Sequence, residues 1–162
     1  MDPGTHPMAE LAIATTQEDY LEAKALLREY GSSIAGTVCA KGFEGECNTV
    51  DSTYGPPTGR FLLLRIGSSS AGCIGLQTCA SAVIEMKRLY VRPSYRGRGL
   101  GRRLVEAAVS MAREVGSPAL RLHTLPAMVA ARHLYRSMGF VSMASTSQNA
   151  YHGDVLMELR LT

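Results

Sequence analysis

The segment Glu85–Gly116 reads EMKRLYVRPSYRGRGLGRRLVEAAVSMAREVG and carries the most informative pattern of the chain. It begins as a strand, breaks at Pro93, tightens into a glycine-rich turn over Arg96–Gly101 and continues as a helix that Gly116 ends. The first N–H groups of a helix lack an intrahelical partner, and the helix dipole adds positive potential there. Glycines let a ligand approach that backbone closely. The segment therefore predicts an anion-binding site at a helix N-terminus.

The composition favours one ordinary globular domain. The chain has 162 residues, of which 46% are hydrophobic and 19% charged, and this excludes a disordered or fibrous protein. A net charge of +3 is too small to predict nucleic-acid binding. No apolar run reaches the roughly 18 residues that span a bilayer, and the N-terminus lacks the regions of a signal peptide. We expect a cytoplasmic protein with no nucleic-acid or membrane partner.

The four cysteines, Cys39, Cys47, Cys73 and Cys79, form no CxxC pair, and no histidine cluster completes a zinc set. We therefore expect no metal. Without a secretion signal, disulfides are not expected either, and we interpret all four as reduced packing residues. Cys73 and Cys79 are expected to share one face of a strand region.

The segments before the glycine turn predict a strand, a helix and a hairpin. A flexible N-terminus is expected over residues 1–10 and a single domain over 11–162. Short polar and apolar alternation predicts a strand over Leu11–Thr15, and helical spacing predicts a helix from Gln17 to about Tyr30, closing near Gly31. Ile34–Tyr54 is expected to be a loop with one short helical piece. Three strands follow in the prediction: Phe61–Ile66, Ala71–Thr78 and Val83–Val91.

The segments after the turn predict a parallel strand, a second helix and two further strands. The helix Leu100–Val115 presents one apolar face, and the strand after it is reached by a crossover, so it should run parallel to the strand before. The remaining expected elements are a strand Ala119–Thr124, a helix Ala127–Ser137, a strand Phe140–Met143, a loop Ser145–Gly153 and a strand Val155–Leu161. The expected core contacts on the two helices are Leu100, Leu104, Ala107, Ala108, Met111, Val115, Val129, Leu134 and Met138.

The fold class that follows is mixed α/β (α+β). We expect a mostly antiparallel sheet of six to seven strands, flanked by about four helices, with one parallel β-α-β step at the anion site.

Two nucleotide motifs can be excluded at the glycine turn. GxGxxG fails because its third glycine would fall at Arg102, and GxxxxGK[ST] is absent. What remains is Arg96-x-x-Gly99-x-Gly101, which resembles the pyrophosphate loop [QR]xxGx[GA] of the GNAT N-acetyltransferase superfamily. The alternative is a tight strand-to-helix turn with solvated arginines.

A second motif strengthens the resemblance. Ala131–Phe140 (ARHLYRSMGF) is similar to the family signature A-x-x-L-Y-x-x-x-G-F, and Leu89–Pro93 (LYVRP) looks like the strand end that splays in this superfamily. Two motifs in the right order are more specific than either alone. The resemblance extends over Leu11–Leu161 and implies the GNAT fold with acetyl-CoA as co-substrate.

The resemblance also implies the residues that hold acetyl-CoA. Backbone N–H groups of Arg96–Gly101 would bind the pyrophosphate, with arginine side chains adding charge-assisted contacts, although each arginine is equally explained as a solvated surface residue. The splayed strand end would expose backbone to the pantetheine amides. The expected set is Leu89, Tyr90, Val91, Arg96, Gly97, Arg98, Gly99, Leu100, Gly101 and Arg102. At Met128 the family often has Asn, so one polar contact to CoA is missing here.

Two residues are implied to be catalytic. Tyr135 matches the family tyrosine that protonates the CoA thiolate, since a phenol is protonated at neutral pH; the alternative is a helix tyrosine packed at the sheet edge. Glu85 matches a strand glutamate that acts as general base. Its alternatives are an ion pair with Lys87 or Arg88, or a contact to the substrate ammonium without proton transfer. His123 is the rival base or a substrate contact, with a core-edge histidine as the simpler interpretation.

The expected function is transfer of an acetyl group from acetyl-CoA to a primary amine, by direct attack in a ternary complex. A backbone N–H near Val91 would polarise the thioester carbonyl. Alternatives are a non-catalytic acyl-CoA-binding module and a protein N-terminal or lysine acetyltransferase. Acceptor specificity is expected in residues 34–54 and 145–153, where Glu44, Glu46 and Asp51 attract a cationic amine or simply form a solvated acidic loop. A homodimer is a family-level expectation.

Overall fold

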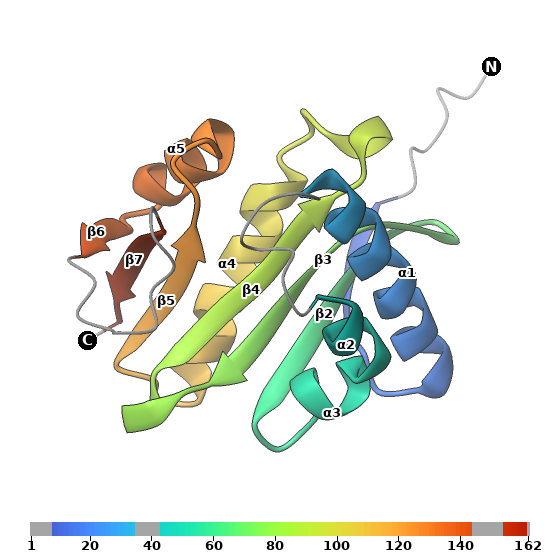
Figure 1. Ribbon diagram of the computed structural model, residues 1–162, viewed down its shortest axis with the longest axis horizontal. Helices are drawn as coiled ribbons and strands as arrows, with labels where there is room; N and C mark the ends of the chain where they lie inside the picture. Colours follow the sequence, from blue (N-terminus) through green and yellow to red (C-terminus); the bar gives the residue numbers. More distant parts are fainter. Residues whose placement is uncertain (1–7, 35–42, 144–153, 162) are drawn as a thin grey trace.

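The computed structural model describes residues 8–34, 43–143 and 154–161 of the chain (Figure 1). A seven-stranded mixed sheet with the order β1-β2-β3-β4-β5-β7-β6 forms its centre. The strands are β1 (Ala9–Ile13), β2 (Gly59–Ile66), β3 (Ser69–Thr78), β4 (Ile84–Val91), β5 (Ala119–Thr124), β6 (Val141–Met143) and β7 (Val155–Arg160). The helices are α1 (Gln17–Ser33), α2 (Phe43–Asn48), α3 (Val50–Tyr54), α4 (Leu100–Glu114) and α5 (Val129–Ser137). The predicted fold class is confirmed, with β4 and β5 as the parallel pair.

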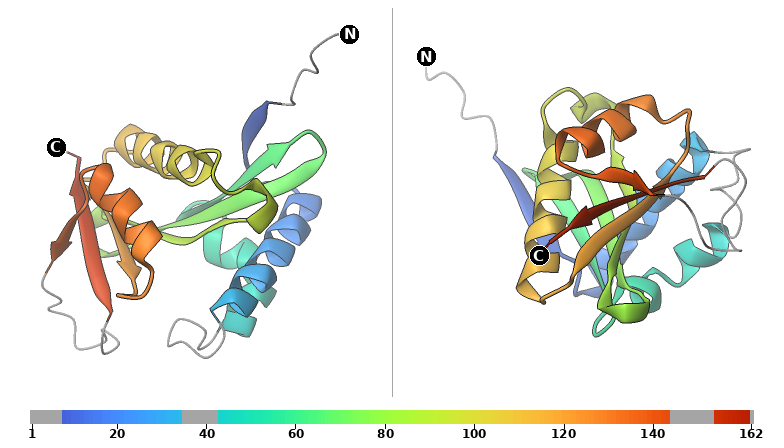
Figure 2. Two further views of the ribbon diagram at one scale, coloured as in Figure 1. Left: turned by 90° about the horizontal axis from the view of Figure 1, so that it is seen from above. Right: turned by 90° about the vertical axis from the view of Figure 1, so that its left-hand side faces the viewer.

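Helices cover both faces of the sheet. Figure 2 shows α4 on one face and α1 with the short helices on the other. Alternation along β2 divides the side chains between two cores, because successive residues of a strand point to opposite faces. Leu62 and Leu64 pack in the α4-side core, whereas Phe61 and Leu63 pack against α1, α2 and α3.

Helix α1 begins at a capping box and continues past its predicted end. The Thr16 hydroxyl accepts a hydrogen bond from the Asp19 N–H, and the Asp19 carboxylate accepts one from the Thr16 N–H. The expected stop near Gly31 is wrong, because the helix runs to Ser33. A Cβ on Gly31 would lie 2.7 Å from the Phe43 ring, so this glycine makes room for α2 instead of ending α1.

The segment between α1 and β2 contains two short helices among its described residues, not the single helical piece expected. Helices α2 and α3 bury Phe43, Cys47, Val50 and Tyr54 against the sheet. Weak periodicity concealed them, because each is only about one turn and a half long. Each helix therefore buries two apolar residues, which is too few to give the repeating apolar pattern of a longer amphipathic helix.

Two predicted core residues are exposed. Val115 is 70% exposed because it lies beyond the last turn of α4, and Val129 is 68% exposed at the first position of α5. The buried face of α4 is rotated toward residues that the sequence analysis omitted, namely Val105, Val109 and Ala112. Cys79 is also exposed, against the packing role expected for it, while Cys47 and Cys73 are buried and free; Cys39 lies outside the described residues.

Strand β4 bends away from β5 after a short contact. In the described part of the chain the two strands pair at Ile84–Leu120 and Glu85–Arg121 and at no other position. Further along β4 the register with β3 shifts, since two residues of β4 lie opposite one of β3, and within this bulge Arg88 has φ of +62°. A bulge bends its strand, so β4 and β5 open into the V seen in Figure 1.

Candidate active site

The N-terminus of α4 lies at the wide end of the V and is built to receive an anion. Gly97 and Gly99 have φ of +80° and +74°, a region that L-residues avoid, and a Cβ on either would meet no neighbour. Gly99 occupies the N-cap position and offers no side chain, and the first turn holds no acidic residue. Among the described residues, the first backbone bond of the helix is Arg103 N–H to Gly99 O. The N–H groups of residues 100–102 are therefore available to a ligand.

The three loop arginines have partners within the protein. The Arg96 Nε donates to Val91 O at 2.9 Å, which ties the loop to the end of β4. The Arg98 guanidinium lies over the Tyr95 ring at 5.5 Å, and Arg102 Nη2 donates to Ser137 Oγ at 2.7 Å. The last bond joins α4 to α5 across the mouth of the V. All three arginines are exposed, and these contacts give each side chain a partner within the protein.

The edge of β4 that faces the V supplies backbone groups. Beyond Glu85, the described part of β5 offers β4 no ladder partner, so alternate N–H and C=O groups of its last residues point into the gap. Leu89 and Val91 pack their side chains on the α4-side core. Tyr90 points to the opposite core, where its hydroxyl donates to Glu29 Oε2 at 3.3 Å. Tyr90 thus positions the strand through its side chain.

Tyr135 lies on α5 with 7% of its surface exposed, and its ring is 5.8 Å from that of Phe140. Burial, with a smaller contribution from the Tyr30 phenol, raises the pKa of Tyr135 well above its usual value. The phenol is therefore protonated at neutral pH.

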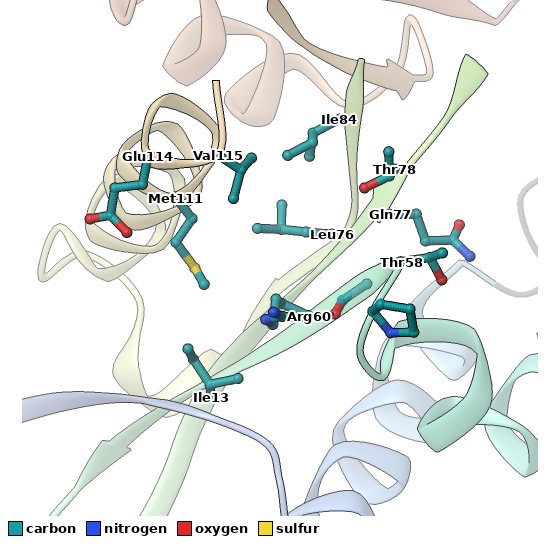
Figure 3. Close-up of a pocket in the computed structure, with 12 residues that line it drawn as sticks. Ile13, Thr58, Arg60, Leu76, Gln77, Thr78, Ile84, Met111, Glu114 and Val115 are labelled. Carbon is teal, nitrogen blue, oxygen red and sulfur yellow. Dashed lines mark hydrogen bonds between the residues drawn. The ribbon is translucent and has the colours of Figure 1, made fainter. Parts of the chain in front are cut away.

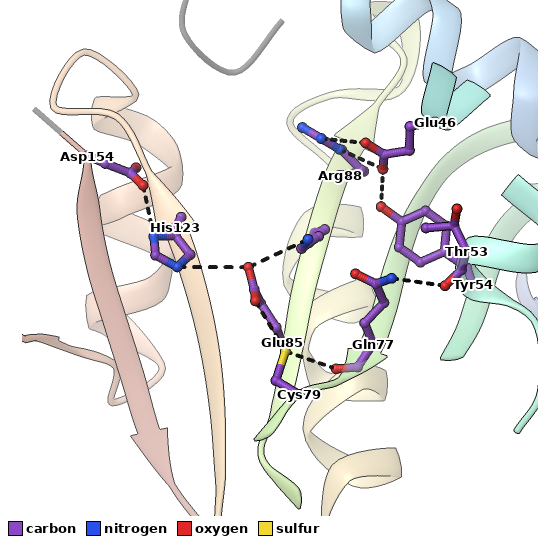
Figure 4. Close-up of polar contacts among 10 residues, drawn as sticks. Glu46, Thr53, Tyr54, Gln77, Cys79, Glu85, Arg88, His123 and Asp154 are labelled. Carbon is purple, nitrogen blue, oxygen red and sulfur yellow. Dashed lines mark hydrogen bonds and ion pairs between the residues drawn. The ribbon is translucent and has the colours of Figure 1, made fainter. Parts of the chain in front are cut away.

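Glu85 lies where β4 and β5 part, on the face of the sheet opposite α4 (Figure 4). Its Oε2 accepts from the Cys79 thiol at 3.4 Å, and its Oε1 is 4.0 Å from Lys87 Nζ and 3.9 Å from His123 Nε2. The Lys87 pair expected as an alternative is present but long. Arg88, the other expected partner, turns elsewhere.

His123 extends this group of side chains from β5. Its Nδ1 is 2.8 Å from Asp154 Oδ2, at the start of β7. The sequence analysis missed Asp154. Pairing of His123 with Leu156 in the β5–β7 register brings the start of β7 beside it, and an acidic residue directly before the last strand was the available signal. We refer to Glu85, His123 and Asp154 as the Glu85 cluster.

A second polar group, the Arg88 cluster, consists of Arg88, Glu46 and Tyr54. Arg88 Nε and Nη2 donate to Glu46 at 3.0 and 2.6 Å, and the Tyr54 hydroxyl donates to the same carboxylate. The Arg88 guanidinium also lies 4.7 Å from the centre of the Phe43 ring. Burial works to raise the pKa of Glu46, but the bonds from Arg88 and Tyr54 outweigh it and lower that pKa. Glu46 is therefore no part of a solvated acidic loop, contrary to that interpretation.

The comparison with known families decides the identity of this arrangement. The model of the acetyltransferase (GNAT) family matches residues 3–140. The chain belongs to the GNAT acetyltransferase family.

Similar proteins agree with that assignment. An uncharacterized N-acetyltransferase of Schizosaccharomyces pombe is 31% identical over 140 residues, which cover 85% of this chain and 83% of that protein. The crystal structure of a GNAT acetyltransferase from Staphylococcus aureus Mu50 superposes with a TM-score of 0.80 at 15% identity, covering 96% of this chain and 100% of that one. PaiA N-acetyltransferase from Thermoplasma acidophilum, solved with coenzyme A, gives 0.73 at 21% identity, covering 94% and 99%. These two solved structures support the fold.

Met128 lies at the position where the resemblance predicts Asn. The Met128 thioether accepts a hydrogen bond from the Thr124 hydroxyl at 3.5 Å, so the residue links β5 to the start of α5. Met128 also packs against the core on the α1 side of the sheet. The position is thus structural in this chain.

A cavity of about 360 Å³ lies apart from the V of this acetyltransferase (Figure 3). It lies between the C-terminal end of α4 and the neighbouring strands, and its walls include Ile13, Arg60, Leu76, Met111 and Val115. No residue of the Glu85 cluster or of the glycine loop contributes to it. The cavity therefore lies apart from the residues that are predicted to carry acetyl transfer.

Residues 8–34, 43–143 and 154–161 contain neither a metal-ion site nor a membrane-spanning helix. No group of three His, Cys, Asp or Glu side chains is arranged to hold a metal ion. No helix there is long and apolar enough to cross a membrane.

Proposed function

We propose that this acetyltransferase moves an acetyl group from acetyl-CoA to a primary amine by direct attack within a ternary complex. The observation that carries the proposal is the placement of two complementary sites at one V. The uncapped start of α4 and the free edge of β4 suit the donor, and the Glu85 cluster at the closed end suits a cationic acceptor.

The residues of the glycine loop fit a pyrophosphate. Gly97 and Gly99 leave the backbone uncovered, the first-turn N–H groups of α4 donate to phosphate oxygens, and Arg98 and Arg102 add positive charge. Arg96 holds the loop to Val91. Backbone groups of Leu89 and Val91 bond to the pantetheine amides, and an N–H near Val91 polarises the thioester carbonyl.

Glu85 receives the acceptor as an ammonium ion beside His123, and the Glu85 cluster supplies the base that removes its proton. Only the neutral amine is a nucleophile, and alkylamines are mostly protonated at pH 7. A carbon–nitrogen bond forms to the carbonyl carbon, the carbon–sulfur bond breaks, and the sulfur leaves with the electron pair. The nitrogen gives up one more proton, so one ammonium and one thioester give an amide, a thiol and one proton.

Tyr135 donates its phenol proton to the departing thiolate. Its raised pKa keeps the proton in place until the sulfur carries negative charge, and the proton from the attacking nitrogen restores the phenol. Burial near Phe140 fixes the ring.

The proposal is tested by thiol release from acetyl-CoA with a panel of amines, polyamines, amino acids and peptides. With the best acceptor, Glu85→Gln and Tyr135→Phe should each lower kcat about 100-fold, the usual contribution of acid–base groups. Matched controls are Glu10→Gln on β1 and Tyr20→Phe on α1, which remove the same groups far from the V. Full rates in both test variants would show that the catalytic assignments are wrong.

A non-catalytic acyl-CoA-binding module is the second candidate, and one observation favours it. Lys87 Nζ lies 4.0 Å from Glu85, so the carboxylate has an ion-pair partner without a catalytic role. A protein that binds acetyl-CoA in calorimetry but releases no thiol with any member of the panel would establish this function. Acetylation of the peptides alone would instead indicate a protein N-terminus or lysine as acceptor.

A further inference from the structure

Asp154 is a buried carboxylate with one oxygen in use. Its side chain is 8% exposed, and its Oδ2 is 2.8 Å from His123 Nδ1. Its Oδ1 is buried and has no hydrogen-bond partner among the described residues. A buried charge that is only partly satisfied costs stability, so such a group calls for a functional explanation.

The Asp154 contact decides which nitrogen of His123 carries the proton. An ionised carboxylate only accepts hydrogen bonds, so Nδ1 must be the donor. The neutral ring then has its lone pair on Nε2, which points toward Glu85 (Figure 4). Nε2 and Glu85 Oε1 are 3.9 Å apart, too far for a direct hydrogen bond. One nitrogen atom placed between them reaches both at about 2.9 Å.

The charges around this gap suit a cation. Glu85 and Asp154 face His123 with negative charge, and Lys87 is the positive group beside Glu85. Arg121, next to Glu85 in the register, is bound to Glu158 at 2.5 Å and so is neutralised. Cys79 contributes a thiol. An excess of negative charge therefore remains for an ammonium ion.

We propose that Asp154 is a positioning residue: it fixes His123 so that His123 Nε2 and Glu85 Oε1 together hold the acceptor ammonium, and His123 takes its proton. This deepens the proposed function and rests on it. The ammonium N–H bond breaks, its electron pair stays on nitrogen, and the proton binds Nε2. The imidazolium formed is stabilised between the Asp154 and Glu85 carboxylates, and it passes the proton to water after acyl transfer.

The tautomer can be measured without any acceptor. In ¹⁵N-labelled protein at alkaline pH, the NMR shifts of His123 should show a protonated Nδ1 and an unprotonated Nε2, and Asp154→Asn should raise the Nε2–H population severalfold. Titration with ethylammonium chloride should shift His123 Nε2 in the wild type and not in Glu85→Gln. An Nε2–H ring in the wild type, or no shift with ethylammonium, would overturn the proposal even if no acceptor is known.

Kinetics separate positioning from a structural role. With the best amine of the panel, Asp154→Asn should lower kcat about 100-fold with little change in the Kd of acetyl-CoA. Its melting temperature should stay level or rise, because a half-satisfied buried charge is removed. Formate should restore part of the rate to Asp154→Ala, and Glu10→Gln is the matched control. If Glu85→Gln loses activity while Asp154→Asn keeps full kcat, the proposed function stands and this inference fails.

Discussion

The two polar clusters on β4 differ in how completely they are satisfied. In the Arg88 cluster two bonds of 3.0 and 2.6 Å join Arg88 to Glu46, and Tyr54 donates to the same carboxylate. In the Glu85 cluster the contacts of Glu85 to His123 and Lys87 are 3.9 and 4.0 Å, and an Asp154 oxygen has no described partner. Glu85 and Arg88, the β4 residues of the two clusters, are three positions apart on that strand.

This difference separates a structural group from a functional one. The closed Arg88 cluster holds a residue with φ of +62°, a backbone strain that surrounding contacts must maintain, and thereby holds the bulge that opens the V. The open Glu85 cluster keeps acceptor atoms unused. Buried polar atoms without partners lower stability, and such exceptions to good packing are expected at functional sites.

Breaking the Arg88 cluster should give the largest effect. Arg88 and Glu46 side chains are 17% and 16% exposed, so Glu46→Ala leaves a mostly buried guanidinium without its partner. We expect the free energy of unfolding in urea to fall by about 3 kcal/mol. Glu44→Ala is the matched control, because Glu44 is 75% exposed and only 3.7 Å from Arg28; its cost should be below about 0.5 kcal/mol. Equal costs for the two variants would contradict the comparison.

Lowering the pH should also reduce the stability that the Arg88 cluster contributes, by a smaller amount than Glu46→Ala does. The folded state lowers the pKa of Glu46 below its ordinary value of 4.5, so the unfolded chain binds the proton more readily. The stabilisation is therefore complete above pH 4.5 and is lost as the pH falls below it. Between pH 6 and 3, the free energy of unfolding measured in urea should fall more steeply with pH for the wild type than for Glu46→Gln. Parallel curves would show that the carboxylate charge does not stabilise the fold.

Removing the charge of Lys87 should strengthen the binding of a cation to the Glu85 cluster. At about 4 Å in water one charge pair is worth about 1 kcal/mol, and Lys87 competes with an ammonium ion for Glu85. We expect Lys87→Gln to lower the KM of a cationic acceptor about threefold at low salt. Arg113→Gln, on the exposed side of α4, removes an equal charge and should leave the KM unchanged. A rise in KM for Lys87→Gln would instead assign the lysine to acceptor binding.

The smallest effect is expected at Cys79. Its thiol donates to Glu85 but is replaceable by a hydroxyl, so Cys79→Ser should keep kcat within about twofold. Burial and the Glu85 carboxylate raise the pKa of Cys79, so N-ethylmaleimide should react faster as the pH rises. In a Cys39→Ser background the adduct should block amine acetylation and leave acetyl-CoA binding intact. Inhibition that persists in Cys79→Ser would place the reactive thiol elsewhere.

The sequence predicted what depends on local pattern. Gly99 directly precedes helix α4 and Gly101 lies in its first turn, so this helix start is a local pattern, and Tyr135 lies in a contiguous motif. Element order and the parallel step also follow from local periodicity and the handedness of crossovers. The family comparison supports this donor half; the catalytic roles of Glu85 and Tyr135 remain predictions.

The contacts on the acceptor side could not be predicted in the same way. Glu46 reaches Arg88 across 42 residues, and His123 reaches Asp154 across 31. Such pairs depend on strand register and on how short helices dock, and neither leaves a periodic signal. The predictions that Val115 and Val129 are core residues were wrong for a related reason. Each lies at a helix end, where the exact position at which the helix begins or ends decides whether a side chain faces the core or the solvent.

Because β4 and β5 pair over such a short length, a ligand that binds between them should also stabilise the folded state. Two paired positions, the α4-side core and the bond from Arg102 to Ser137 hold the halves of the sheet together. A ligand that bonds to the free β4 edge adds hydrogen bonds where β4 has no strand partner. At 100 times its Kd such a ligand adds about 2.7 kcal/mol to the free energy of unfolding. The supply of donor would then govern resistance to proteolysis as well as the rate of acetylation.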